Sequence, residues 1–388
     1  QVITGLELKY HYYLTIEDNL FETNTTQSSY KFMYLYYCSG YSNVIENEMI
    51  YTGTSTMSSS YGIHLYYCDY PKVEKNIIEY GTNSGRYGLY VYECSYGTIA
   101  NNLVHVGYNS SSYCMYMYYA DYMDVYYNTF KLTSSSSSGS VLYMRDSYYI
   151  ESKNNIFYNS GSGYAYYLYN YYSSYFTSSD FNCLYTNGSY PVYTSSNQTF
   201  SQWQSYWDNN SIEANPHFEN DTSFFTQQYI MDGAGVPVAG IGDDFYGNPR
   251  PLSQPDIGAF EFIIPENDAG IIDINNNLEL CDNNGAAEII MVDFKNYGTD
   301  TLNSVTINWI VNGNMQTPFQ WTGSLLQGEE IYDIVVGTYQ FDIGVSNSIK
   351  SWTSNPNSSA EGFVYNDTLE IAGPHLALAG NYTIGGTN

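Results

Sequence analysis

The stretch YGLYVYECSYGTIANNLVHVGYNSSSYCMYMY, residues 87–118, decides the fold because it contains more than one period of an internal repeat. Within it, the run LYVY at 89–92 alternates apolar residues with tyrosines, and the run MYMY at 115–118 repeats that alternation 26 residues later. Such alternation is typical of β-strands, because successive residues of a strand point to opposite faces. The stretch therefore predicts a β-repeat.

An asparagine recurs once in each period along the first half of the chain. Aligning VIENEMI, KNIIEY, NNLVHV, YNTFKL, NNIFYN and FNCLYT, with EDNLFE before them, gives steps of 28, 29, 26, 26, 27 and 27 residues. A period of this length, rich in Tyr, Val, Ile and Thr and interrupted by Gly, Ser and Asn, fits one coil of a parallel β-helix with three short strands. Stacked coils place equivalent residues about 4.8 Å apart. We therefore expect a column of bonded side-chain amides at Asn19, Asn47, Asn76, Asn102, Asn128, Asn155 and Asn182.

The alternating strand of each coil predicts which side chains face outward. Leu89 and Val91 align with apolar residues in the neighbouring periods, so these two positions are expected to face the core. The positions between and after them carry Tyr34, Tyr36, Tyr66, Tyr90, Tyr92, Tyr116, Tyr118 and Tyr143, with His64 in the first of the two series. We expect two exposed tyrosine columns. They have two interpretations: tyrosine suits strands and stacks on its neighbours, or the aromatic face is a docking surface.

Composition limits the classes of partner. The 388 residues include 11 Lys and Arg against 39 Asp and Glu, a net charge of -28, which repels nucleic acid and anionic lipid surfaces. No stretch approaches the roughly 20 apolar residues of a membrane span, so direct membrane insertion is not expected. The six cysteines form no CxxC pair and are expected to be small buried apolar residues.

The second half of the chain differs in composition from the first, since 40 of the 48 tyrosines precede position 194. After IIPEND, the segments IIMVDFKNYG, VTINWIVNG, FQWTGSL and IYDIVVG follow one another at a spacing of roughly ten residues, which is typical of an antiparallel sandwich. Cys281 is the single cysteine of this part, so no internal disulfide is expected there.

Three parts of the chain carry a resemblance to a known family. DDFYGNPRP (243–251) with PDIGAFEF (255–262) resembles the closing segment of right-handed parallel β-helix proteins of the Bacteroidetes type, which implies a capped last coil. The run NYGTDTLNSVTINWIVNG with WTGSL is similar to the immunoglobulin-like adhesion modules between β-helix units of giant secreted surface proteins. The final LALAGNYTIGGTN resembles the start of a following unit. The resemblance covers most of residues 150–388 and implies export by type IX secretion.

These observations together predict an all-β chain. Residues 1–262 are expected to form a right-handed parallel β-helix with a C-terminal cap, residues 263–374 an immunoglobulin-like β-sandwich, and residues 375–388 the start of the next unit. The first residues lack the zones of a signal peptide, so the chain is expected to be mature or a segment of something longer. The resemblance implies a structural repeat segment of an extracellular filament or adhesin. Its expected partners are neighbouring repeat units, glycans or other cell-surface proteins.

Two triplets match the D-[ST]-apolar pattern of O-glycosylation in Bacteroidetes. They are Asp300-Thr301-Leu302 and Asp367-Thr368-Leu369, which makes Thr301 and Thr368 the expected attachment sites.

Parallel β-helices often host polysaccharide lyases, so a carbohydrate-binding or carbohydrate-degrading role is the alternative. A lyase needs clustered acidic side chains and a basic residue to take the proton. Asp124 and Glu151 share a slot on successive coils, but we expect a solvated turn there. We expect no catalytic residue, no cofactor and no metal. One alternative stays open, a Ca²⁺ ion at Asp243 and Asp244.

Overall fold

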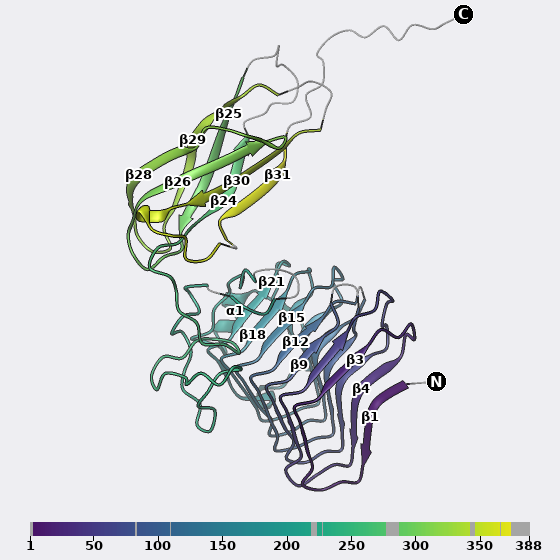
Figure 1. The fold of residues 1–388 in the computed structure, drawn as a ribbon. Coiled ribbons are helices and arrows are strands. Elements are labelled where there is room, and N and C mark those ends of the chain that lie inside the picture. The colour runs from purple at the N-terminus through teal and green to yellow at the C-terminus, as the bar shows by residue number, and fades with distance from the viewer. Residues whose placement is uncertain are drawn as a thin grey trace, which may run out of the picture. The chain divides into compact units, whose positions relative to one another are not determined.

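The chain consists almost entirely of β-structure, and the computed structural model describes residues 3–81, 84–108, 110–218, 223–226, 228–276, 287–341, 346–364 and 366–373. It divides into two compact units, Gln1–Phe262 and Ile263–Asn388 (Figure 1). The first consists of stacked parallel coils and the second of antiparallel sheets, which confirms the predicted fold class. Cys281 and the segment 375–388, predicted to start a further unit, lie outside the described residues.

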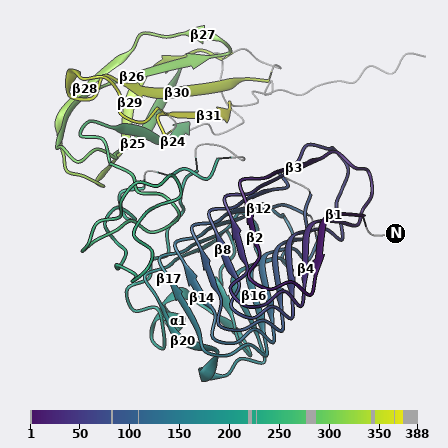
Figure 2. The same ribbon diagram turned by 60° about the horizontal axis from the view of Figure 1, so that its bottom comes forward.

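Each coil of the first unit gives one strand to each of three sheets (Figure 2). The first sheet contains, in order, β1 (Ile3–Lys9), β4 (Tyr30–Tyr36), β7 (Tyr61–Tyr66), β10 (Tyr87–Tyr92), β13 (Tyr113–Tyr118), β16 (Ser140–Arg145), β19 (Tyr164–Tyr169), β22 (Val192–Tyr193) and β23 (Asn197–Gln198). The second contains β2 (Thr15–Glu17), β5 (Asn43–Ile45), β8 (Lys72–Glu74), β11 (Thr98–Ala100), β14 (Asp124–Tyr126), β17 (Ile150–Lys153) and β20 (Phe176–Asp180). The third contains β3 (Leu20–Thr23), β6 (Glu48–Tyr51), β9 (Ile77–Glu79), β12 (Leu103–Val106), β15 (Thr129–Leu132), β18 (Ile156–Asn159) and β21 (Cys183–Thr186).

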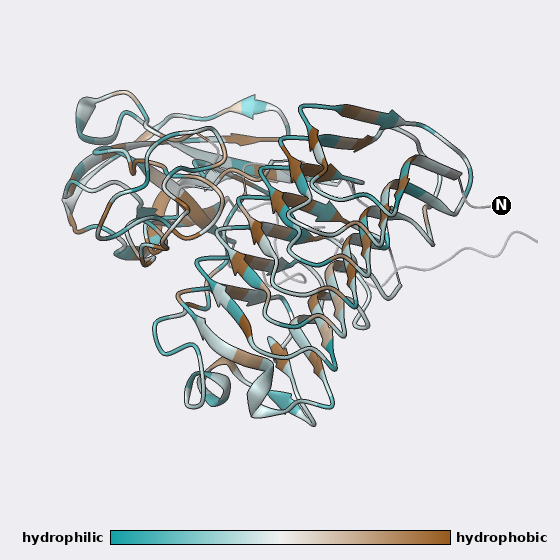
Figure 3. Cartoon of the chain, turned by 90° about the horizontal axis from the view of Figure 1, so that it is seen from below, coloured by the Kyte–Doolittle hydropathy of each residue, from teal (hydrophilic) through white to brown (hydrophobic). Residues whose placement is uncertain are grey.

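The register of the sheets follows the repeat of the sequence. Leu89 pairs with Ile63 on the preceding coil and with Met115 on the following one. These inward residues are buried, and Figure 3 shows hydrophobic and hydrophilic residues alternating along the strands. Cys38, Cys68 and Cys94 are buried in the same core, as expected of small apolar residues. A continuous hydrophobic core therefore runs through the stacked coils.

Each coil turns its corners through residues in the left-handed backbone region, where side chains other than glycine are uncommon. The first corner holds Tyr10, Tyr37, Tyr67, Glu93, Tyr119, Asp146 and Asn170; the second holds Tyr13, Tyr41, Tyr70, Tyr96, Tyr122 and Tyr149; the third holds Asp18, Glu46, Lys75, Asn101, Tyr127, Asn154 and Phe181. Most of their backbone N–H groups donate to the next coil, as Tyr67 N does to Tyr92 O at 2.9 Å. Coil-to-coil bonding thus compensates a conformation that costs about 1–2 kcal/mol per residue.

The last coil is closed by α1 (Phe200–Gln204) and the residues that follow it. The helix begins with a capping box formed by Thr199 and Gln202. Trp203 is buried against the rings of Tyr166 and Phe176. Ile212 N donates to Asn182 O at 2.8 Å, so the chain continues the hydrogen bonding of the third sheet beyond β21. This segment covers the apolar end that a coil stack would otherwise expose.

The closing segment 243–262 was expected to cap the last coil, but it is part of a longer stretch, 231–262, that lies along the third corner instead. Its hydrogen bonds to four successive coils join Lys75 Nζ to Asp243 Oδ2 (2.7 Å), Asn101 Nδ2 to Asp243 O (3.0 Å), Tyr127 OH to Val236 O (2.8 Å) and Asn154 Nδ2 to Val236 O (2.8 Å). The polar side chains of this corner column donate to backbone carbonyl groups of the segment and, at Lys75, to the carboxylate of Asp243. It therefore ties coils together along the stack.

The second unit packs two antiparallel sheets around one core. The first sheet has the order β24 (Ala269–Asn276), β25 (Glu288–Asn296) and β29 (Glu330–Tyr339). The other sheet has the order β27 (Asn314–Met315), β26 (Leu302–Val311), β30 (Ser348–Ser354) and β31 (Thr368–Ala372), with β28 (Phe319–Leu325) also paired to β26 and the short helix η2 (Pro356–Ser358) after β30. Phe294 and Trp321 meet between the sheets with ring centroids 5.2 Å apart.

Candidate contact surface

The asparagines of the repeat form one continuous column of hydrogen bonds. Each Nδ2 donates to the Oδ1 of the next member, at 2.9 Å for Asn19, Asn102 and Asn128 and at 3.0 Å for Asn47, Asn76 and Asn155. The same Oδ1 also accepts the backbone N–H of the preceding member, as Asn102 Oδ1 does from Asn76 N at 3.0 Å. Members from Asn47 to Asn182 are fully buried, so their bonds fix the coil register away from water.

The column ends on a buried carboxylate that the sequence alignment missed. Asn182 Nδ2 donates to Asp208 Oδ1 at 3.3 Å, and Asp208 also accepts bonds from Ser179, Ser211 and the indole of Trp203. A terminal member needs only to accept, because no further coil follows it, and a carboxylate offers acceptors alone. Burial raises the pKa of Asp208 in spite of these donors.

The first predicted tyrosine column lies on the first sheet. Tyr90, Tyr116 and Tyr143 stack with ring centroids 4.9 and 4.5 Å apart and planes within 3° of each other. The column continues beyond its predicted end through Tyr167 and Tyr193, at 5.3 and 4.5 Å. At its other end Tyr34 contacts the ring of His64 at 4.8 Å. One aromatic stripe therefore spans most of the sheet.

The second predicted column runs beside it. Tyr36, Tyr66 and Tyr92 lie 5.4 and 4.5 Å apart, and Tyr118 meets Tyr92 edge to face at 5.3 Å. A basic residue then replaces the tyrosine: Arg145 lies over the ring of Tyr118 at 4.8 Å and over Tyr169 at 4.9 Å. The guanidinium continues the stack through cation–π contacts.

The exposure of these columns differs from the expectation. Their tyrosines are half-buried, because a third column on the same strands, Tyr61, Tyr87 and Tyr113, crowds against the first. His64 is 6% exposed beneath neighbouring rings. Burial, with the charge of Lys31 nearby, lowers the pKa of His64 to about 3. The ring points outward from the sheet but is covered.

The most accessible tyrosine column lies at the second corner. Tyr70, Tyr96, Tyr122 and Tyr149 stack at 5.3, 4.9 and 4.7 Å, and Tyr96 is 52% exposed. A shallow pocket is lined by Tyr96, Tyr122, Asp124, Tyr149, Glu151 and Thr177. The repeat alone could have indicated this column, since Tyr70, Tyr96 and Tyr122 recur every 26 residues.

The acidic residues weighed as a catalytic or Ca²⁺ site have local partners. Asp124 pairs with Glu151 across adjacent coils, and Lys153 bonds to Glu151. Burial and the neighbouring Glu151 raise the pKa of Asp124. Asp243 forms an ion pair with Lys75 at 2.7 Å.

Asp244 is fully buried and accepts bonds from Asn248 N at 2.8 Å and Glu261 N at 3.1 Å, which is the hydrogen bonding of a turn. In the second unit, Thr368 is exposed at the start of β31 and Thr301 is half-buried before β26.

One comparison with known proteins falls on the stacked coils of the first unit. The family described as periplasmic copper-binding protein (NosD) matches residues 2–218, and no curated protein matches. Among solved structures, the chain is similar to the CARDB domain of a Pyrococcus furiosus protein in complex with di-metal ions. The identity is 17% and the TM-score 0.25, over 30% of this chain and 99% of that one. No helix in the described part of the chain has the length and apolar character needed to cross a bilayer. Because the family match spans more than half of the 388 residues and falls on the stacked coils, the chain belongs to the NosD family.

Proposed function

We propose that this chain is a structural repeat segment of an extracellular filament or adhesin, which gives length and stiffness and makes contacts through its tyrosine columns. The single observation that carries the proposal is the corner column Tyr70, Tyr96, Tyr122 and Tyr149, because it presents stacked rings to solvent over four coils. Exposed aromatic patches of this kind are characteristic of interaction sites. The periplasmic description of the family supports a location outside the cytoplasm.

Stiffness is supported by features that join one coil to the next. The asparagine column links seven coils through 2.9–3.0 Å bonds, and the segment 231–262 bonds to four successive corners. Solenoid repeats otherwise contact only their neighbours. The proposed partners are neighbouring repeat units of the same protein or filament. Type IX secretion and attachment to the cell surface are proposed because the sequence resemblance implies them. Glycosylation at Thr301 and Thr368 is proposed from the two D-[ST]-apolar triplets.

The family description names copper, but the described residues of the first unit do not fit a copper site. Copper is bound by imidazole, thiolate and thioether groups. The ring nitrogens of His105 already contact Glu79 at 2.6 Å and Thr133 at 2.8 Å, and Cys68 is a buried thiol whose pKa is raised to about 12. Among the described residues, the group of three ligating side chains that could hold a metal lies in the second unit and consists of carboxylates. The proposed function therefore includes no copper chemistry.

A second candidate, a carbohydrate-binding surface, is favoured by the pocket at the second corner. Its exposed rings lie beside Asp124 and Glu151, and sugars stack on aromatic faces while carboxylates accept their hydroxyl hydrogens.

Sedimentation velocity across a concentration series tests the proposed contact. The variant Tyr96→Ser/Tyr122→Ser/Tyr149→Ser should weaken association by on the order of tenfold or more, because aromatic anchors dominate interface energies. The matched control is Tyr12→Ser/Tyr206→Ser/Tyr332→Ser, which removes three exposed rings outside the stacked columns and should associate like the unmodified chain. A chain that stays monomeric throughout, or a control that loses as much association as the variant, contradicts the proposal.

Binding of the unmodified chain to a glycan array, abolished in the variant Tyr96→Ser/Tyr122→Ser/Tyr149→Ser, would favour the second candidate.

A further inference from the structure

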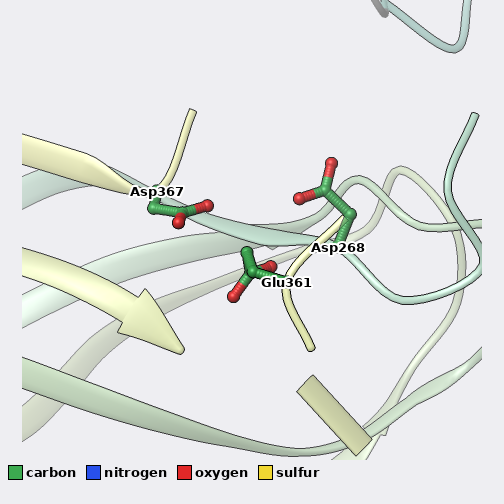
Figure 4. A group of neighbouring side chains, drawn as sticks. All are labelled: Asp268, Glu361 and Asp367. Carbon is green, nitrogen blue, oxygen red and sulfur yellow. The ribbon is translucent and has the colours of Figure 1, made fainter. Parts of the chain in front are cut away.

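Three carboxylates meet in the second unit although they are distant in sequence. Asp268 directly precedes β24, whereas Glu361 and Asp367 belong to the segment between η2 and β31 (Figure 4). One ligand oxygen from each lies within 4.8 Å of the others. Asp268 is 2% exposed and Asp367 6% exposed. Like charges this close and this buried destabilise one another unless something compensates them.

Hydrogen bonds satisfy some oxygen atoms of this group and leave others without a partner. Asp268 Oδ2 accepts from Asn366 Nδ2 at 2.9 Å, and Glu361 Oε1 accepts from Ala269 N at 3.0 Å. Four buried oxygens have no hydrogen-bond partner: Asp268 Oδ1, Glu361 Oε2, Asn366 Oδ1 and Asp367 Oδ1. When the carboxyl groups are ionised, all four of these oxygens are acceptors, and the ion pairs of the described residues include none of the three carboxylates.

We propose that Asp268, Glu361, Asp367 and the side-chain oxygen of Asn366 form a Ca²⁺ site that stabilises the second unit. The open oxygens are hard ligands of the kind that Ca²⁺ takes in sets of six to eight. Mg²⁺ fits less well, since it retains several waters and uses one or two carboxylates. This site is separate from the tyrosine columns and does not depend on the function proposed for them.

Without a cation, burial disfavours the ionised forms of the three carboxyl groups. Burial raises the pKa of Asp268 to about 6, that of Asp367 to about 7 and that of Glu361 to about 8, with the neighbouring carboxylates adding to the last two. A bound cation would favour the ionised forms and reverse these shifts.

The site would connect two parts of the unit through the ion. Asp367 O already accepts from Ile271 N at 3.2 Å and from Thr353 N at 3.3 Å, and Gly362 N donates to Asn267 O at 3.1 Å. Backbone bonds thus hold Gly362 and Asp367 against the start of β24, and a cation would add side-chain ligands from both parts. Extracellular modules bind Ca²⁺ with dissociation constants of about 10⁻⁴–10⁻³ M, which sets the range to be examined.

Calorimetric titration of the whole chain, freed of metal with EDTA, tests the site directly. Titration with CaCl₂ should show one binding event that Glu361→Gln and Asp367→Asn each weaken by on the order of tenfold or more, while MgCl₂ gives a smaller response. The matched control is Glu370→Gln, which removes an exposed carboxylate from β31 in the same part of the chain and should bind Ca²⁺ like the unmodified protein. Since both site variants relieve like-charge repulsion, they should unfold at higher temperature than the unmodified chain in EDTA and gain nothing from Ca²⁺.

Several outcomes would overturn the assignment. These are the absence of any Ca²⁺ binding up to about 10 mM, equal binding by the two site variants and the unmodified chain, or equal loss in Glu370→Gln. Loss of the binding event on Asp243→Asn, with the site variants unaffected, would place the ion in the first unit and contradict the assignment as well.

Discussion

The asparagine column makes a quantitative prediction about the substitution Asn102→Ala. Asn102 is fully buried, donates through Nδ2 to Val73 O at 2.8 Å and to Asn128 Oδ1 at 2.9 Å, and accepts from Asn76 N at 3.0 Å. Alanine removes the acceptor of the Asn76 N–H and a donor to the Val73 carbonyl. A buried polar group left unsatisfied costs about 1–3 kcal/mol. The two groups together predict a loss of about 2–6 kcal/mol.

Hydrogen exchange followed by mass spectrometry measures this loss where it should occur. Since 1.4 kcal/mol corresponds to a factor of ten, a loss of about 3 kcal/mol should speed exchange of peptides covering β8 to β12 by about 100-fold. Asn19→Ala is the matched control, because Asn19 begins the column at an exposed position and its removal leaves no buried donor without an acceptor. The reasoning is refuted if Asn102→Ala costs less than about 1 kcal/mol or no more than Asn19→Ala.

Three further predictions follow from buried charges. Asp208→Ala should lower the free energy of unfolding by about 3 kcal/mol or more, because the donors of Trp203, Ser179 and Ser211 lose their shared acceptor. The wavelength of Trp203 emission during urea unfolding measures this loss, and an unchanged urea midpoint would contradict it. Arg250→Ala should lower the free energy of unfolding by about 3–5 kcal/mol, since it leaves Glu261 without its buried partner and removes a cation–π contact 3.7 Å from the ring of Tyr127. Limited proteolysis should then cut the segment 231–262 faster than in the unmodified chain. Equal rates of cleavage would show that Arg250 does not hold the segment in place. Without Ca²⁺, Asp268, Asp367 and Glu361 should contribute their full stabilisation below about pH 4 and lose it as pH rises through their raised pKa values of about 6, 7 and 8, because the folded state binds these protons more tightly. Thermal unfolding in EDTA from about pH 4 to 9, compared with that of Glu361→Gln, measures this contribution, and equal pH dependence of the two chains would contradict it.

Features that repeat in the sequence were predictable. The alternation in 89–92 and its return in 115–118 give both the strand faces and the coil length, and parallel pairing of equivalent residues then follows. Asn102 and its counterparts were recognisable because residue type and spacing recur together. Local periodicity is sufficient where each coil repeats the contacts of the previous one.

Features that depend on neighbours from other coils or on long separations were not predictable in this way. His64 occupies an outward position, yet the rings of Tyr34 and Tyr90 on the adjacent coils cover it. Asp208 ends the asparagine column with a different residue type. Asp268 and Glu361 are brought together by sandwich topology, which no short motif encodes. The sequence at the end of the segment 231–262 resembles that of a cap on a last coil, but the segment bonds to corner side chains of earlier coils.

The stacking of one coil on the next can be measured most directly by methyl NOEs in the intact chain. Leu89, Met115 and Leu142 occupy equivalent positions on three successive coils, and β-sheet pairing places such residues about 4.8 Å apart. Selective methyl labelling of leucine and methionine should give NOEs from Met115 to both Leu89 and Leu142. Absence of both NOEs, with Met115 instead showing contacts to residues that are not one coil away, would contradict the columns and every contact inferred from them.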